Sequence, residues 1–103
     1  MEKVDLSQFH VVDNKELSQF QLVVNGYVSK IEYSLKEGKL FLIHTEVPEE
    51  LAGQGIAAYL AKGAFQLIEE QGKKIVPMCS YINTYLRKHP EFQKFLVAGI
   101  KIE

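Results

Sequence analysis

The chain has 103 residues, of which 47 % are hydrophobic and 24 % charged, and its formal net charge is −1. This composition is that of an ordinary globular domain, so it excludes a disordered chain. The charge leaves no basic surface for duplex nucleic acid or for an anionic membrane. We therefore expect one domain over residues 1–103, with neither nucleic acid nor membrane among its partners.

The cysteine content and the N-terminus point to the cellular compartment. Cys79 is the single cysteine, so an internal disulfide is excluded and a reducing setting is favoured. No apolar signal segment follows Met1, and no apolar run approaches the length of a membrane span. The sequence therefore predicts a cytoplasmic protein.

The first half of the chain predicts an antiparallel meander. Asn25-Gly26 favours a two-residue hairpin turn, because both positions must adopt positive φ. A second tight connection is expected at 36–39. Phe20, Leu22 and Val24 alternate along the first expected strand and predict its buried face. The three strands joined by these turns are expected at 17–24, 27–35 and 40–47.

The second half predicts helices packed on a parallel addition to this sheet. Apolar residues at helical spacing (Ile56, Leu60, Gly63, Ala64, Leu67) predict a helix over 55–71, with Gly72 as its C-terminal cap. The further elements expected are a strand at 74–79, a helix at 81–88 with Ser80 as its N-cap, a short helix or turn at 91–96, and a last strand at 97–102. A right-handed crossover would make the strand at 74–79 parallel to the strand at 40–47. The order predicts an α+β fold with a mixed sheet.

Two glycines, Gly53 and Gly55, lie where the third strand is expected to give way to the long helix. The first N–H groups of a helix have no internal acceptor, and the helix dipole adds positive potential at the same place. Glycine lets the backbone approach an anion closely. The pattern is typical of a phosphate or pyrophosphate site, although such turns also occur in α/β domains that bind nothing there. It is neither a Walker motif nor a complete dinucleotide fingerprint.

Four motifs in chain order resemble the GNAT superfamily of N-acetyltransferases, and within it a branch of small single-domain members. They are His-Thr-Glu-Val-Pro at 44–48, Gly-Gln-Gly-Ile-Ala at 53–57, Pro-Met-Cys at 77–79 and His-Pro-Glu-Phe at 89–92. The resemblance covers about residues 17–96. It implies a GNAT-like fold and an acetyl-CoA-dependent N-acetyltransferase, whose acceptor is a small amine or an amine of a protein or peptide. The alternative is a CoA-binding module without catalysis, acting as a sensor or a partner-binding protein.

The resemblance also implies which residues contact CoA. The family pattern Q/R-x-x-G-x-G/A falls on residues 52–57, with Ala52 where Gln or Arg is usual. Leu86 falls where many members carry a proton-donating tyrosine, and Tyr85 is one residue away. No metal ligand set is expected. The residues expected to bind acetyl-CoA are Val47, Gly53, Gln54, Gly55, Ile56, Ala57, Ala58 and Lys88, the last through the 3′-phosphate.

Cys79 and His44 are the candidate catalytic residues. In this branch the cysteine is the suspected reactive group, and a thiol before a helix is acidified by the helix N-terminus and by a nearby histidine. His44 lies on the expected neighbouring strand, so the two could form a nucleophile and base pair. Alternatively His44, Glu46 or the thiolate deprotonates an amine that attacks the thioester directly. The structural alternative is that Cys79 is a small buried hydrophobic residue and His44 an ordinary strand residue.

Overall fold

The computed structural model describes residues 5–102, whose strands form one five-stranded sheet in the order β1-β2-β3-β4-β5. The neighbours from β1 to β4 pair antiparallel, and β4 pairs with β5 in parallel. The predicted mixed sheet, antiparallel first and parallel later, is confirmed. The strands are β1 (Val12–Asn14), β2 (Gln19–Val24), β3 (Tyr27–Lys36), β4 (Lys39–Glu46) and β5 (Lys74–Pro77).

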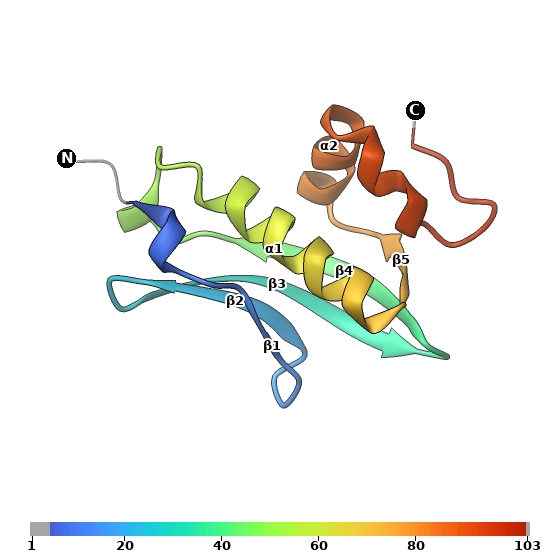
Figure 1. Cartoon of the computed structure of the whole chain (residues 1–103), viewed down its shortest axis with the longest axis horizontal. Coiled ribbons are helices and arrows are strands. Elements are labelled where there is room, and N and C mark those ends of the chain that lie inside the picture. The colour runs from blue at the N-terminus through green and yellow to red at the C-terminus, as the bar shows by residue number, and fades with distance from the viewer. Residues whose placement is uncertain (1–4, 103) are drawn as a thin grey trace.

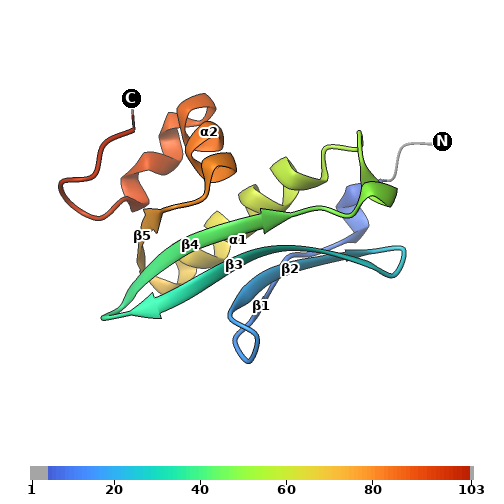
Figure 2. The ribbon, with the colours of Figure 1, turned by 180° about the vertical axis from the view of Figure 1, so that it is seen from behind.

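Two α-helices and three short 3₁₀ turns complete the described chain. Figure 1 shows α1 lying along one face of the sheet. In the same view α2 and η3 lie beside the edge of the sheet that β5 forms. Seen from behind in Figure 2, β3 and β4 lie in front of α1, so the opposite face of the sheet carries none of the described helices. The elements are η1 (Leu6–Gln8), η2 (Glu49–Leu51), α1 (Ile56–Gln71), α2 (Ser80–Lys88) and η3 (Pro90–Phe95).

The core lies between α1 and the sheet. Phe20, Leu22 and Val24 of β2 are fully buried, as their alternation predicts. The buried residues of α1 are Ile56, Leu60, Ala61, Ala64, Phe65 and Ile68. Two members of the predicted apolar stripe, Gly63 and Leu67, are only partly buried at its margin. At Gly63 the side chain of Val11 occupies the space that a Cβ would need, so the N-terminal segment packs directly on the helix there.

Two expectations about element boundaries are wrong. β5 ends at Pro77, because the N–H groups of Met78 and Cys79 both donate to the Leu42 carbonyl at 2.9 Å and the ladder goes no further. Ser80 is the first residue of α2 and not its N-cap. Cys79 is the N-cap, since it keeps an extended backbone (φ −82°, ψ 130°).

Two further differences concern the sheet edges. The segment 97–102 forms no strand. Pairing with β5 at this edge is limited to an isolated bridge between Leu96 and Ile75 and one hydrogen bond, from the Val97 N–H to the Ile75 carbonyl at 3.0 Å. At the other edge, β1 was not expected, because three residues carry too little periodicity to predict a strand. In the part of the chain that the structure describes, no helix is both long and apolar enough to span a bilayer.

Candidate functional site

The connection from β4 to α1 places two glycines in the left-handed region. Gly53 has φ +79° and Gly55, the N-cap of α1, has φ +71°. A Cβ added to either would meet no other atom within 4 Å. The backbone conformation therefore requires glycine at both positions, while the space beside them stays open.

The start of α1 presents unpaired backbone donors. Within residues 5–102, no hydrogen-bond acceptor lies at the N–H groups of Gly53, Gly55 or residues 56–58; the first bonded amide is that of Tyr59, which donates to the Gly55 carbonyl at 3.1 Å. Gly55 offers no capping side chain, and the first turn of α1 holds no acidic residue. The positive end of a four-turn helix is thus left without a protein anion, and an external anion would be stabilised there.

A groove of about 350 Å³ runs beside these donors. Its lining comes from the residues that follow β4, from the start of α1 and from the first turn of α2. The pairing between β4 and β5 ends before this point, at Leu42 and Pro77. Six of the eight residues expected to bind acetyl-CoA line it, together with Tyr81 of α2. The full lining is Val47, Pro48, Leu51, Ala52, Gly53, Gly55, Ile56, Ala57, Ala58 and Tyr81.

The other two expected CoA-binding residues lie elsewhere. Gln54 is buried and lines a second groove of about 340 Å³ on the other side of Gly55 and Ala58, which also includes Tyr85 and His89. Lys88 is exposed in the last turn of α2 and is not among the residues lining either groove.

A β-bulge in β4 decides which side chains face this region. Glu32 of β3 pairs with His44 and Tyr33 pairs with Leu42, so Ile43 is left without a partner. Directly opposed residues share a face of the sheet, and one extra residue reverses the alternation that follows it. Thr45 therefore lies opposite Ile31, which is fully buried, and His44 falls on the outer face with Glu32.

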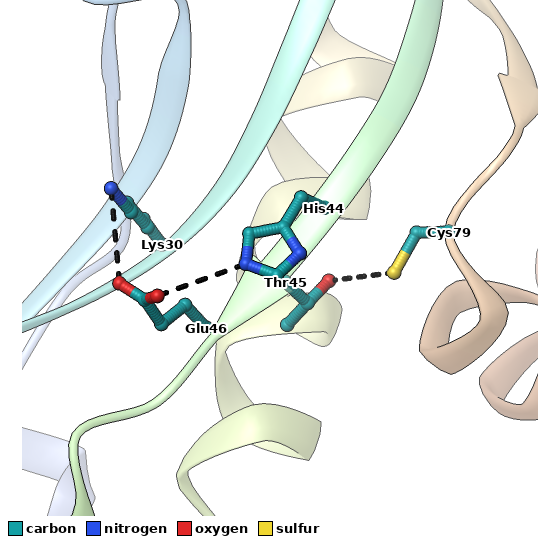
Figure 3. Close-up of polar contacts among 5 residues, drawn as sticks. All are labelled: Lys30, His44, Thr45, Glu46 and Cys79. Carbon is teal, nitrogen blue, oxygen red and sulfur yellow. Dashed lines mark hydrogen bonds and ion pairs between the residues drawn. The ribbon is translucent and has the colours of Figure 1, made fainter.

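Thr45, and not His44, contacts Cys79. The Thr45 Oγ1 atom lies 3.3 Å from the Cys79 Sγ atom, as Figure 3 shows. The His44 ring is turned toward Glu46 in the same figure, with 3.8 Å between Nε2 and Oε1, and Glu46 also pairs with Lys30 at 3.8 Å. No hydrogen bond joins His44 to Cys79 among the described residues. The His44 side chain is 54 % exposed, whereas Cys79 is 7 % exposed.

The backbone around Cys79 is held on both sides. Its N–H donates to the Leu42 carbonyl at 2.9 Å, and its carbonyl accepts from the Asn83 N–H at 3.1 Å. The Asn83 side chain donates to the same carbonyl and to that of Pro77, both at 3.0 Å. These bonds fix the turn between β5 and α2 from which the thiol projects.

Two tyrosines of α2 line the grooves, Tyr81 the first and Tyr85 the second. Burial raises the pKa of the Tyr81 hydroxyl, and negative charge on Cys79 raises it further. Burial also raises the pKa of Tyr85, with smaller contributions from Tyr81 and Glu91. Both hydroxyls therefore remain protonated and able to donate at neutral pH. Leu86, in the position where many members of the resembled family carry a tyrosine, is fully buried and lies on neither groove.

Sequence reasoning did not assign a site role to three residues here. Thr45 and Asn83 were overlooked, because their contacts depend on a bulge and on a turn that join distant segments. His89, which enters the sequence analysis only as part of the His-Pro-Glu-Phe motif, lines the second groove and stacks on Tyr85 with 4.3 Å between ring centroids. The i, i+4 spacing of Tyr81, Tyr85 and His89 is the signal that places all three along one side of α2.

Within residues 5–102, no three histidine, cysteine or acidic side chains come together as metal ligands would. The arrangement brings together unpaired amides at a helix start, an adjoining groove, and the Cys79 thiol near the point where β4 and β5 separate.

Comparison with known proteins shows which family this chain resembles. The model of the GCN5-related N-acetyl-transferase family matches residues 19–95. Protein NATD1 of Xenopus tropicalis is 35 % identical over 88 residues, covering 82 % of this chain and 80 % of that protein. Protein NATD1 of Mus musculus is 36 % identical over 84 residues, covering 78 % of this chain and 76 % of that protein.

A solved structure shares the fold. The solution structure of a GCN5-like protein from Staphylococcus aureus superposes with a TM-score of 0.65, covering 89 % of this chain and 90 % of that one, at 24 % identity. Since the family model spans most of the chain and the NATD1 proteins are similar over about four-fifths of it, the chain belongs to the GCN5-related (GNAT) N-acetyltransferase family.

Proposed function

We propose that this protein is an acetyl-CoA-dependent N-acetyltransferase, acting on an amine of a small molecule, a peptide or a protein. The observation that carries the proposal is the row of unpaired amides at the start of α1, which opens onto the 350 Å³ groove. The family generally uses acetyl-CoA and acts on amines. A diphosphate matches the amide row, because it brings negative charge and several acceptors to adjacent donors.

The groove suggests how the rest of CoA is held. Its walls are mainly apolar and include Val47, Leu51, Ile56 and Tyr81, so they suit the pantetheine chain. Val47 lies two residues after Thr45, and Tyr81 two residues after Cys79. A chain that enters at the amides and follows β4 therefore runs toward the Thr45–Cys79 contact.

The proposed chemistry uses Cys79 as nucleophile. Its thiolate attacks the thioester carbonyl carbon, a new S–C bond forms, and the old C–S bond breaks with CoA leaving as the thiolate. The acceptor amine then attacks acetyl-Cys79, the amide forms, and Cys79 is released as thiolate. His44 or Glu46, both exposed on the outer face, takes the proton that the amine loses. In this proposal the Tyr81 hydroxyl, which lines the groove and stays protonated, donates a hydrogen bond to the departing CoA sulfur.

A second candidate function is a CoA-binding protein with little turnover. Ala52 lacks the Gln or Arg side chain of the family pattern, and Leu86 is buried where a tyrosine acid is usual. The first weakens diphosphate binding without removing it, since the backbone amides remain, and the second weakens catalysis. The free thiol of Cys79 supports a cytoplasmic setting for either function.

Mass spectrometry after incubation with acetyl-CoA separates these possibilities. We expect one added acetyl group on Cys79 of the wild-type protein, removed when an amine acceptor is supplied. Cys79→Ala should retain CoA affinity and lose transfer. An unmodified Cys79 with full amine acetylation would favour direct attack on the thioester, and CoA binding with no acetylation of either kind would favour the binding protein.

A further inference from the structure

We propose that Thr45 is the positioning residue of the Cys79 thiol, a role that rests on the proposed function of Cys79 as the acetylated residue. The Thr45 hydroxyl holds Sγ in one orientation and donates a hydrogen bond to it when the sulfur is a thiolate. His44, the residue that the sequence places beside the cysteine, does not occupy this position.

The contact joins two segments that are each fixed by other bonds. Thr45 is held in β4 opposite fully buried Ile31, on the side of the sheet that the bulge turns toward the core. Cys79 is held by its N–H bond to Leu42 and by the Asn83 bonds to its carbonyl. With both backbones constrained, the 3.3 Å separation between Oγ1 and Sγ is set by the two χ1 angles alone.

Threonine suits this task. Branching at Cβ restricts χ1, so the hydroxyl is presented in few orientations. A thiolate sulfur is only an acceptor, and the single hydroxyl proton of Thr45 is therefore donated to it. A hydrogen bond to a charged group is stronger than one to a neutral group, so the contact holds the sulfur most firmly when it attacks as the thiolate.

The location agrees with a positioning role. Cys79 is 7 % exposed, and Thr45 is partly buried beside it. Bulk water competes little for a hydrogen bond in such a place. The exposed His44–Glu46 pair lies on the outer face of β4, so it does not compete with Thr45 for the thiol.

The test is the rate at which iodoacetamide alkylates Cys79 at a fixed neutral pH. We expect Thr45→Val, which keeps the shape and removes the hydroxyl, to slow alkylation about tenfold or more. Thr45→Ser should restore most of the rate, because the donor returns. Thr84→Val, at an exposed threonine of α2, is the matched control and should react like the wild type.

Two accompanying measurements keep the result interpretable. The amide NMR spectrum of each variant shows whether the native fold persists, and Thr45→Ala replaces Thr45→Val if valine disturbs it. The affinity for CoA should be unchanged in every variant. Alkylation of natively folded Thr45→Val at the wild-type rate, or failure of serine to restore it, overturns the role of Thr45. A wild-type protein that does not bind CoA overturns the proposed function and leaves the alkylation result standing.

Discussion

The two ends of helix α1 are built in opposite ways. At the C-terminal end, Gly72 adopts the left-handed conformation (φ +66°), its N–H donates to the Glu69 carbonyl at 3.0 Å, and the Lys73 N–H donates to the Ile68 carbonyl at 3.3 Å. At the N-terminal end, Gly55 adopts the same conformation, but the amides of 56–58 find no acceptor within residues 5–102.

The two ends of α1 also differ in their side-chain hydrogen bonds. Beyond the C-terminal end, the Asp13 carboxylate accepts from the Tyr33 hydroxyl at 2.6 Å and from the Gln71 amide at 2.9 Å, and Lys73 donates to Gln71 at 2.9 Å. The N-terminal end has no side-chain cap and no acidic residue in its first turn. Helix ends are normally satisfied by the protein. The end that is left unsatisfied is therefore the end available to a ligand.

The largest effect is expected from Ala58→Glu, at the third residue of α1. A glutamate there would accept from the orphan amides and match the helix dipole, stabilising the free protein by about 0.3–1 kcal/mol. The same carboxylate would repel a diphosphate and compete for its donors, so CoA affinity should fall at least about tenfold. Stability by denaturant unfolding and affinity by calorimetry would then change in opposite directions.

Ala58→Gln is the matched control for this charge. It adds a side chain of the same size without a negative charge, and we expect a much smaller loss of affinity. Equal losses for Glu and Gln would mean that bulk in the groove, and not charge at the amides, determines binding.

Asp13→Ala tests the C-terminal end of α1, where the protein itself satisfies the polar groups. The Tyr33 hydroxyl and the Gln71 amide would lose their shared acceptor, and we expect the free energy of unfolding to fall by about 1–3 kcal/mol. Urea unfolding measures the change. CoA affinity should not change, because Asp13 lies at the opposite end of α1 from the amides; a large loss of affinity would show that the two ends are coupled.

Gly55→Ala and Gly72→Ala form a pair with the same backbone strain at opposite ends. Both glycines have φ near +70° and open space around them, so each alanine should cost about 1 kcal/mol of stability. Gly55→Ala alone should weaken CoA binding, since it distorts the amide row. Similar affinities for the two variants would contradict a ligand site confined to the N-terminal end.

The smallest effect concerns alkaline pH. Burial raises the pKa of Tyr33, and its hydrogen bond to Asp13 raises it further. Tyr33 therefore retains its proton in the folded state above pH ~10, where tyrosines of the unfolded chain ionise. The native state then binds more protons, so stability should fall as the pH rises above ~10. Unfolding measured across this range should show a shallower decline for Tyr33→Phe; an identical decline would contradict the assignment.

The elements that the sequence predicts well are those with local signals. The hairpin at Asn25-Gly26, the long helix after Gly55 and its cap at Gly72 all depend on residues next to one another in the chain. Phe20, Leu22 and Val24 identify the buried face of β2 in the same way. The glycine turn could likewise be placed at a helix start, because the positive φ values of Gly53 and Gly55 are a local requirement.

What could not be predicted depends on pairing between distant segments. The bulge at Ile43 arises from the register between β3 and β4, and no glycine marks it. It moves His44 to the outer face and brings Thr45 to Cys79, so the expected contact between His44 and Cys79 does not form. Cys79 replaces Ser80 as N-cap for a similar reason, since its N–H is bonded to Leu42 across the sheet.

The central claim is that the unpaired amides at the start of α1 bind the diphosphate of CoA. Amide NMR of the ¹⁵N-labelled wild-type protein during titration with CoA tests it most directly. The account predicts large, saturable shifts at Gly53, Gly55 and residues 56–58, with little change at Gly72 and Lys73. Saturable binding that leaves those first amides unmoved, or no binding at all, would contradict it.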